Sequence, residues 1–318
     1  MKILIYGFGR MGLTHFSILN GINPQAQFCV IEPNRLLRML LKKNINASFY
    51  NDDSNFKDAF DLTLITTPPS MHLQILEKSL NRGDKKIFIE KPFGGHTNTN
   101  YKNTLQLRNT IYIGYVLRFN PCIQWVKNHI NPKDIKSING QYLSNTIEKK
   151  PTGWRNGSFS GVLNEMGSHV IDLIQYIIGE DQMNVLSSKS ESVVSDIDDI
   201  IEAELKTKNG ISISMYFNWV KKDIRKPVFT IEIEMKNGYK YLIDQQQINK
   251  YDRDGNHIKK ISVTNLATNI PFYLRGVDFT NQMLDLLGAQ KIMASVNDAL
   301  EVNKLMKKIL HYENNTWR

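Results

Sequence analysis

Cysteine is scarce in this chain. Only Cys29 and Cys122 occur among 318 residues, so a disulfide-stapled fold is excluded and no cysteine pair stands at zinc-ligand spacing. The apolar stretches are also far too short to cross a bilayer. A strand that we expect to begin at Lys2 leaves no room for a signal peptide. We therefore expect a cytoplasmic protein with no metal site and no membrane anchor.

Acidic residues are outnumbered: 31 of them stand against 40 lysines and arginines, for a net charge of +9. The basic residues lie in scattered pairs, such as Lys42–Lys43 and Lys307–Lys308, and form no arm or stripe. No zinc-finger spacing or RNA-binding aromatic signature accompanies them, so we expect no nucleic-acid partner. The positive surplus suits a phosphorylated or nucleotide-linked small molecule. Solvated surface lysines would explain it equally well.

What the chain does have, at its start, is an apolar strand over residues 2–6 that runs into a glycine turn and a helix. Gly7, Gly9 and Gly12 follow the spacing G-x-G-x-x-G. In this context the first glycine permits a tight turn, the second lets the backbone approach a pyrophosphate, and the third lets helix and strand pack closely. The free N–H groups of the helix start would bind the phosphates. The predicted cofactor-binding turn comprises Gly7, Phe8, Gly9, Arg10, Met11 and Gly12.

The second apolar strand, residues 28–31, ends on Glu32, twenty residues after Gly12. A carboxylate at this point accepts hydrogen bonds from a ribose 2′-hydroxyl and repels a 2′-phosphate. The sequence therefore predicts NAD as the cofactor, with NADP less favoured. Arg35 lies one helical turn further on and could soften this preference.

The first part of the chain alternates strands and helices, which is typical of a doubly wound parallel sheet. Ligands of such sheets gather at the carboxyl ends of the strands, where the glycine turn, Thr67–Pro68, Lys91 and Arg118 are expected. We interpret residues 1–119 as an NAD-binding Rossmann domain. Its other expected elements are strands 62–66, 86–89 and 111–115 and helices 70–80 and 98–108.

The remainder, residues 120–318, has a different order of expected elements, with long strands between residues 185 and 261. We predict a C-terminal α/β domain with a large, open, mostly antiparallel sheet backed by helices. Because Ile213 and Met215 alternate with Ser214 and Tyr216, neither face is strongly polar, and we expect another subunit to cover one face. Hairpin turns are expected at Asn209–Gly210, Asn237–Gly238 and Asp254–Gly255, and helices at 123–130, 162–178, 276–287 and 297–312.

Three polar residues in the helix expected at 162–178 stand at spacings of four and three: Glu165, His169 and Asp172. These spacings place them on one face of an α-helix. An acid one turn before a histidine can orient the ring and raise its basicity. A buried structural histidine capped by a carboxylate is the alternative.

Five segments of the sequence stand out in order: residues 7–12 (Gly-Phe-Gly-Arg-Met-Gly), 67–72 (Thr-Pro-Pro-Ser-Met-His), 90–92 (Glu-Lys-Pro), 114–121 (Gly-Tyr-Val-Leu-Arg-Phe-Asn-Pro) and 161–172 (Gly-Val-Leu-Asn-Glu-Met-Gly-Ser-His-Val-Ile-Asp). Together they resemble the Gfo/Idh/MocA oxidoreductases, a family that includes glucose–fructose oxidoreductase and inositol dehydrogenase. The resemblance implies a Rossmann domain, a C-terminal α/β domain whose open sheet mediates dimer or tetramer contacts, and hydride transfer between nicotinamide and a sugar or cyclitol carbon.

The resemblance also implies the catalytic residues. Lys91 matches the family's lysine, which donates to the substrate oxygen, and His169 matches the histidine that acts as base in oxidation. Glu165 stands where the family usually has aspartate, and it would orient Lys91 or His169. Asp172 matches an acid that can bind a substrate hydroxyl and could equally be structural.

Further positions follow from the same motifs. Thr67, Pro68 and Glu90 match cofactor-binding positions, and His72 matches a histidine that we interpret as structural. The expected substrate-binding residues are Arg118, Asn120, Trp154 and Arg155, with loop packing as the alternative for each.

Three functions are compatible with these observations. The first is an NAD(P)-dependent sugar oxidoreductase acting on a nucleotide sugar or another anionic sugar, working as a homodimer or homotetramer. The second is a dehydrogenase of a free sugar or a cyclitol such as inositol. The third is a non-catalytic NAD-binding sensor or regulator; the joint presence of Lys91 and His169 argues against it.

Overall fold

A computed structural model describes residues 1–94, 110–156, 160–179, 182–262 and 276–312. The chain divides into two compact units, Met1–Val116 with Ala267–Leu300 and Leu117–Leu266 with Glu301–Arg318. The helix expected at 98–108 lies outside the described residues. No described helix has both the length and the apolar character that crossing a membrane requires.

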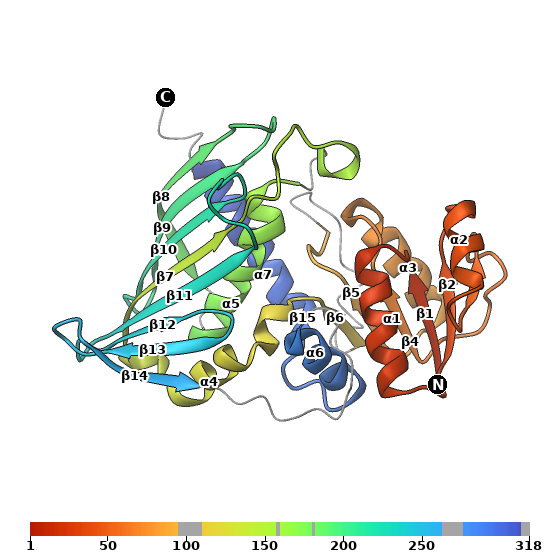
Figure 1. Cartoon of the computed structure of the whole chain (residues 1–318), viewed down its shortest axis with the longest axis horizontal. Coiled ribbons are helices and arrows are strands. Elements are labelled where there is room, and N and C mark those ends of the chain that lie inside the picture. The colour runs from red at the N-terminus through yellow and green to blue at the C-terminus, as the bar shows by residue number, and fades with distance from the viewer. Residues whose placement is uncertain (95–109, 157–159, 180–181, 263–275, 313–318) are drawn as a thin grey trace. The chain divides into compact units, whose positions relative to one another are not determined.

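The first unit contains a seven-stranded sheet in the order β15-β6-β5-β4-β1-β2-β3 (Figure 1). All pairs among β1 to β6 are parallel, and β15 joins the edge antiparallel to β6. The predicted doubly wound sheet is thus confirmed. The strands are β1 (Lys2–Tyr6), β2 (Gln27–Ile31), β3 (Ser48–Tyr50), β4 (Leu62–Ile65), β5 (Ile87–Ile89), β6 (Ile111–Ile113) and β15 (Ala294–Ser295).

The central strands of this sheet are apolar because helices cover them. Ile3, Leu4 and Ile5 of β1 are fully buried, as expected for a strand between two helical layers. Helix α3 begins after the 3₁₀ turn Pro69–Met71 and ends at Arg82, where Gly83, with φ 83°, caps it. The helices of the unit are α1 (Arg10–Ile22), α2 (Arg35–Lys42), α3 (His72–Arg82), α6 (Val277–Leu287) and the first turn of α7 (Val296–Tyr312).

The second unit contains an eight-stranded sheet in the order β14-β13-β12-β11-β7-β10-β9-β8. Only the β7–β10 pair is parallel among the described strands of this sheet. The three predicted hairpin turns join β9 to β10, β11 to β12 and β13 to β14. The strands are β7 (Ile135–Leu143), β8 (Met183–Glu191), β9 (Ile200–Thr207), β10 (Ser212–Asn218), β11 (Val228–Met235), β12 (Lys240–Ile243), β13 (Gln247–Tyr251) and β14 (His257–Ser262).

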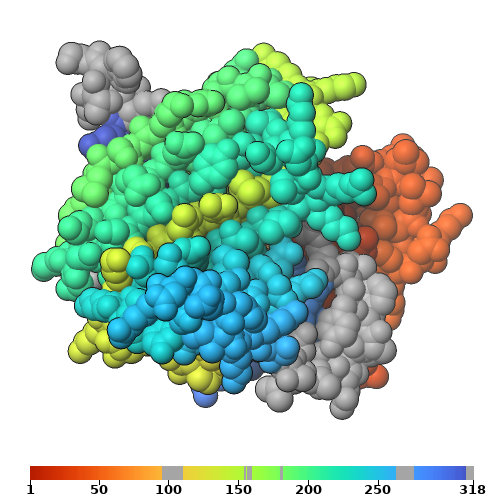
Figure 2. Space-filling view, turned by 60° about the vertical axis from the view of Figure 1, so that its left-hand side comes forward, coloured from red at the N-terminus to blue at the C-terminus, as the bar shows by residue number. Residues whose placement is uncertain are grey.

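One face of this sheet packs against helices. Helix α5 (Ser168–Ile178) lies on β7, where Gly140 leaves room for Val170 and Ile174, and α4 (Pro121–His129) packs beside α5. Figure 2 shows the opposite face, on which β7, in yellow, crosses between its neighbours with no helix of the described residues over it. That open face presents Asn139, Gln141, Glu202, Glu204, Lys206, Ser212, Ser214 and Tyr216, all exposed or half-buried.

Candidate functional site

The glycine turn of the first unit has the geometry that its sequence predicts. Gly7 has φ +81°, which is the left-handed region. A Cβ on Gly12 would lie 2.1 Å from Gly7 O, so a side chain there would separate the helix from the turn. Thr66 Oγ1 donates to Tyr6 O at 2.9 Å and to Gly7 O at 2.7 Å. This hydroxyl, which the sequence reasoning missed, fixes the entry into the turn.

The start of α1 fits a dinucleotide phosphate. Gly9 is its N-cap, and within the described part of the chain no side chain caps the helix start. A Cβ on Gly9 would meet no atom of the described residues within 4 Å, so the backbone there is open to a ligand. Thr67 Oγ1 is buried, with no hydrogen-bond partner among the described residues, and Thr67 lies against Gly7. These features together suit NAD phosphates.

Glu32 points at the turn. Its Oε2 accepts the Phe8 N–H at 3.1 Å and its Oε1 accepts the Asn34 N–H at 3.0 Å. The carboxylate thus lies beside the predicted phosphate site, where it could accept hydrogen bonds from the ribose hydroxyl groups of a dinucleotide. Arg38, unrecognised in the sequence, donates to the carbonyls of Glu32 and Pro33 at 2.6 and 2.8 Å, whereas Arg35 is exposed.

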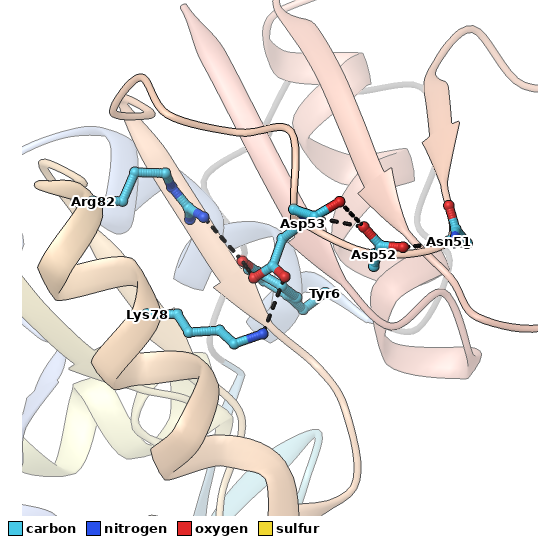
Figure 3. A network of polar contacts seen from close by, with 7 residues as sticks. Tyr6, Asn51, Asp52, Asp53, Lys78 and Arg82 are labelled. Atoms are coloured by element: carbon cyan, nitrogen blue, oxygen red, sulfur yellow. Dashed lines mark hydrogen bonds and ion pairs between the residues drawn. The ribbon is translucent and has the colours of Figure 1, made fainter.

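A polar network ties the end of β1 to α3 (Figure 3). The Tyr6 hydroxyl donates to Asp53 Oδ2 at 2.8 Å and accepts from Arg82 at 3.0 Å, and Lys78 Nζ lies 3.0 Å from Asp53 Oδ1. Burial is the main reason that the pKa of Tyr6 is raised. Burial opposes ionisation of Asp53, but hydrogen bonds from Tyr6 and Lys78 outweigh it and lower its pKa. Because Tyr6 immediately precedes Gly7, the network steadies the strand that enters the turn.

The tripeptide Glu90-Lys91-Pro92 follows β5. The Glu90 N–H donates to Ile65 O of β4 at 2.9 Å, and Lys91 is half-buried. His15 and His72, both fully buried, contact the segment on either side of the lysine. His72 therefore has the structural contacts that its position predicts, and His15 was missed because no spacing in the sequence links it to residue 90.

In the second unit, the helix predicted at 162–178 is not α-helical throughout. Leu163–Gly167 form a π-helical turn, after which α5 begins at Ser168. Because a π turn has a different period from an α-helix, the expected single face for Glu165, His169 and Asp172 holds only for the last two. The change of period follows from the Ser168 N–H bonding to Leu163 O, which hydrophobic periodicity does not reveal.

Glu165 is held by residues that precede it in the chain. Its Oε1 lies 3.2 Å from Arg155 Nε and accepts from Ser160 Oγ at 3.4 Å. His169 is half-buried in the first turn of α5, with its ring 6.5 Å from that of Tyr142. Arg155 and Glu165 thus form one ion pair. The side chain of Trp154, another predicted substrate-binding residue, lies outside the described part of the structure.

Asp198 supports this helix and was not found in the sequence. Its Oδ2 accepts the Leu163 N–H at 2.8 Å, and its backbone carbonyl accepts the Val162 N–H at 2.8 Å. A Cβ on Gly161, which has φ +109°, would lie 2.1 Å from Asp198 Oδ1. Burial raises the pKa of Asp198 to about 7, against the opposing hydrogen bond from Leu163. The only sequence signal was a pair of adjacent aspartates in a loop.

Two predicted substrate-binding residues make extensive contacts within the second unit. Arg118 forms a buried ion pair with Asp172. Asn120 caps α4, because its Oδ1 accepts the Cys122 and Ile123 N–H groups at 2.9 and 3.4 Å, while its Nδ2 donates to Gln245 O at 3.0 Å. These contacts match the packing alternative for both residues, and their contribution to substrate binding stays a prediction.

Comparison with known proteins places these observations in a family. Residues 1–107 match the family model for the oxidoreductase family with an NAD-binding Rossmann fold, and residues 134–238 match the model for the GFO/IDH/MocA C-terminal domain. A curated relative, oxidoreductase P35 of Formosa agariphila, is 26% identical over 175 residues, which are 51% of this chain and 54% of the relative. The match thus spans about half the length of that relative.

Solved structures share the fold over nearly the whole chain. A levoglucosan dehydrogenase in complex with NADH and levoglucosan has a TM-score of 0.82 and 17% identity, covering 99% of this chain and 97% of the other. UDP-N-acetylglucosamine 3-dehydrogenase from Acidithiobacillus ferrooxidans has a TM-score of 0.72 at 17% identity, with the same coverage. With both family models matched in order, the chain belongs to the Gfo/Idh/MocA oxidoreductase family and carries its NAD-binding Rossmann domain.

Proposed function

We propose that this protein is an NAD-dependent dehydrogenase or reductase that transfers a hydride between nicotinamide and a hydroxyl or keto carbon of a sugar. The observation that carries the proposal is the placement of Glu90-Lys91-Pro92 directly after β5, in the same sheet as the glycine turn. Ligands of doubly wound sheets bind at that carboxyl edge. A cationic side chain at this edge can act on a substrate beside the cofactor.

The roles proposed for Lys91 and His169 are those that their match to the family motifs implies, and the chemistry of each side chain supports them. The Lys91 ammonium donates a hydrogen bond to the substrate oxygen and stabilises the negative charge that develops there. The His169 imidazole accepts the hydroxyl proton in oxidation and returns it in reduction. Glu165, paired with Arg155, orders the turn that precedes His169. When bound, NAD supplies the nicotinamide that accepts or returns the hydride.

The substrate we favour is a nucleotide sugar or another anionic sugar. The net charge of +9 supports it, as does the shared fold with a UDP-N-acetylglucosamine 3-dehydrogenase. A free sugar is the second candidate, because a levoglucosan dehydrogenase has the same fold with a higher TM-score. The two differ in charge, so a substrate panel separates them.

We also propose a homodimer or homotetramer formed through the open face of the second sheet. That face carries both signs of charge, for example Glu202 and Lys206, and half-buried Tyr216. A mixed polar face of this kind can pair with a second copy of itself. Sedimentation or light scattering of the wild type and of Tyr216→Lys would measure the association.

The test of the activity is NAD reduction, followed by absorbance, with UDP-N-acetylglucosamine, levoglucosan and myo-inositol as substrates. We expect turnover with the nucleotide sugar and a loss of several orders of magnitude in Lys91→Ala, with NADH binding near that of the wild type. His169→Ala should flatten the pH profile of oxidation. If no sugar or cyclitol is oxidised while NADH binds tightly, the sensor alternative replaces this proposal.

A further inference from the structure

Two buried histidines contact the residues on either side of Lys91. His15 Nε2 lies 2.7 Å from Glu90 Oε1, and His72 Nδ1 lies 3.2 Å from Pro92 O. Both imidazoles are 0% exposed. The neighbour before the lysine is therefore held from α1, and the neighbour after it lies against α3, all within the first unit.

The His15 ring has a fixed orientation. It packs edge-on against Phe88, with ring centroids 5.0 Å apart, and lies 6.3 Å from the Phe279 ring. Since these aromatic groups and complete burial leave the ring little room to rotate, its Nε2 stays directed at Glu90. The shortness of the contact is typical of a hydrogen bond to a charged carboxylate.

The Glu90 carboxylate is enclosed as well. Its side chain is only 12% exposed, and its second oxygen, Oε2, lies against Gly114, where a Cβ would be 3.1 Å away. The absence of a side chain on Gly114 thus makes room for the carboxylate. One oxygen of Glu90 is thus bound by His15 and the other packs on Gly114, so movement of the carboxylate is restricted.

His72 makes a different kind of contact. Its Nε2 lies 2.8 Å from Thr67 O, closer than its Nδ1 lies to Pro92 O. Burial lowers the pKa of His72, against the two carbonyls that raise it, so the neutral ring is favoured. A neutral ring has a single N–H, and the shorter contact directs it to Thr67. His72 therefore donates to Thr67 O of the cofactor segment, and its Nδ1 lies near Pro92 O without donating to it.

These contacts matter because a lysine side chain is long and flexible. Its ammonium can act on a reacting oxygen only if the backbone that bears it is held in place. The Glu90 N–H bond to Ile65 O anchors the main chain, and the His15–Glu90 contact is the side-chain counterpart. Helix α1, which begins at the phosphate-binding turn, thereby also contacts the lysine segment.

We propose that His15 is a positioning residue for Lys91: through Glu90 it fixes the segment that presents the lysine ammonium, without touching the substrate itself. The proposal rests on the proposed function in one respect, that Lys91 is the group that acts on the substrate. It makes His15 a determinant of turnover that contacts no reacting atom.

The first experiment needs neither cofactor nor substrate. A lysine-directed reagent acetylates the NAD-free protein, and mass spectrometry measures the rate at Lys91. This rate reports how accessible and how reactive the Lys91 amine is. In His15→Leu we expect this rate to change by about tenfold, because a hydrogen bond to a charged group contributes on that order to local opening. Lys78, paired with Asp53, serves as the internal reference and should not change.

Three further variants test whether a changed labelling rate is due to loss of the His15–Glu90 hydrogen bond. His15→Gln keeps an N–H donor and should restore the wild-type rate. Glu90→Gln removes the charge without altering the shape, so it should reproduce the change even if His15→Leu fails to fold. Ile18→Ala makes a cavity in the same helix, at a buried residue, and should lower the melting temperature without altering the labelling of Lys91. An equal change in Ile18→Ala would overturn the proposal.

Turnover then separates this inference from the proposed function. We expect His15→Leu to lose turnover on the active sugar while its Kd for NADH stays near that of the wild type. If Lys91→Ala keeps wild-type turnover, the proposed function fails. If Lys91→Ala is inactive but His15→Leu matches the wild type in both labelling and turnover, only the role of His15 is refuted.

Discussion

Arg118 and Asp172 form a two-point ion pair inside the second unit. The arginine Nε and Nη2 lie 2.8 and 2.5 Å from the two carboxylate oxygens, and both side chains are buried. The guanidinium carbon also lies 4.9 Å from the centre of the Tyr176 ring. The pair connects the segment before α4 with the middle of α5, so it has a structural function whether or not it also meets a substrate.

Removal of one member of this pair should destabilise the protein. We expect Asp172→Ala to lower the free energy of unfolding by about 3–5 kcal/mol, because it leaves a buried guanidinium without its carboxylate. The double variant Arg118→Met/Asp172→Leu should recover much of the loss. Denaturant unfolding measures both. A fully stable Asp172→Ala protein with a raised KM would instead favour the substrate-binding role.

The glycine turn offers a matched pair of substitutions. Gly12→Ala places a methyl group 2.1 Å from Gly7 O and should cost about 1–3 kcal/mol of stability through overpacking. The added methyl group of Gly9→Ala meets no atom within 4 Å in the part of the chain that the structure describes. The melting temperature of this variant should therefore stay near that of the wild type while NADH binding weakens. Thermal melts and NADH fluorescence titrations distinguish the two. Equal melting temperatures would contradict the packing role of Gly12.

Cofactor choice should depend on Glu32. Because its carboxylate already accepts the Phe8 N–H beside the turn, it is placed to accept from a ribose hydroxyl. We expect Glu32→Ala to weaken NADH binding by about tenfold or more and NADPH binding by less. Glu77→Ala, the same charge change at an exposed position of α3, is the control. A wild-type protein that prefers NADPH would refute the assignment.

Asp198 should give stability a dependence on pH. Its pKa is raised to about 7 in the folded chain, mainly by burial, and stays near the usual 3.9 when the chain unfolds. Between about pH 4 and 7 the folded state therefore binds the extra proton, and the stability that this proton contributes is lost as pH rises.

Asp198→Asn isolates this effect. The amide keeps an oxygen acceptor for the Leu163 N–H but does not ionise. The melting temperature of the variant minus that of the wild type should therefore become more positive between pH 5 and pH 8. Carboxyls that do not interact with residue 198 are common to both proteins and cancel in the difference, whereas the charges of Asp199 and Glu165 raise the Asp198 pKa and are part of the effect. A difference that does not vary with pH would show that Asp198 is already ionised at pH 5.

Elements whose information is local could be predicted from the sequence alone. The glycine spacing after an apolar strand specifies a phosphate-binding turn, Glu32 ends the next strand, and Asn-Gly or Asp-Gly pairs specify the hairpins. Each depends on the backbone preferences or burial of a few consecutive residues, so a short stretch of sequence was enough. The order of the motifs was enough to identify the family.

Which distant groups meet depends on how the folded chain packs. His15 and Glu90 are 75 residues apart, Arg118 and Asp172 are 54 apart, and Asp198 lies 35 residues from the helix start that it holds. The π turn at Leu163–Gly167 is a further example, since the N–H of its first residue is bound by Asp198. Such contacts arise when strands and helices pack. Helix and strand propensities depend on local sequence, so they do not predict which distant residue will become the partner of a given side chain.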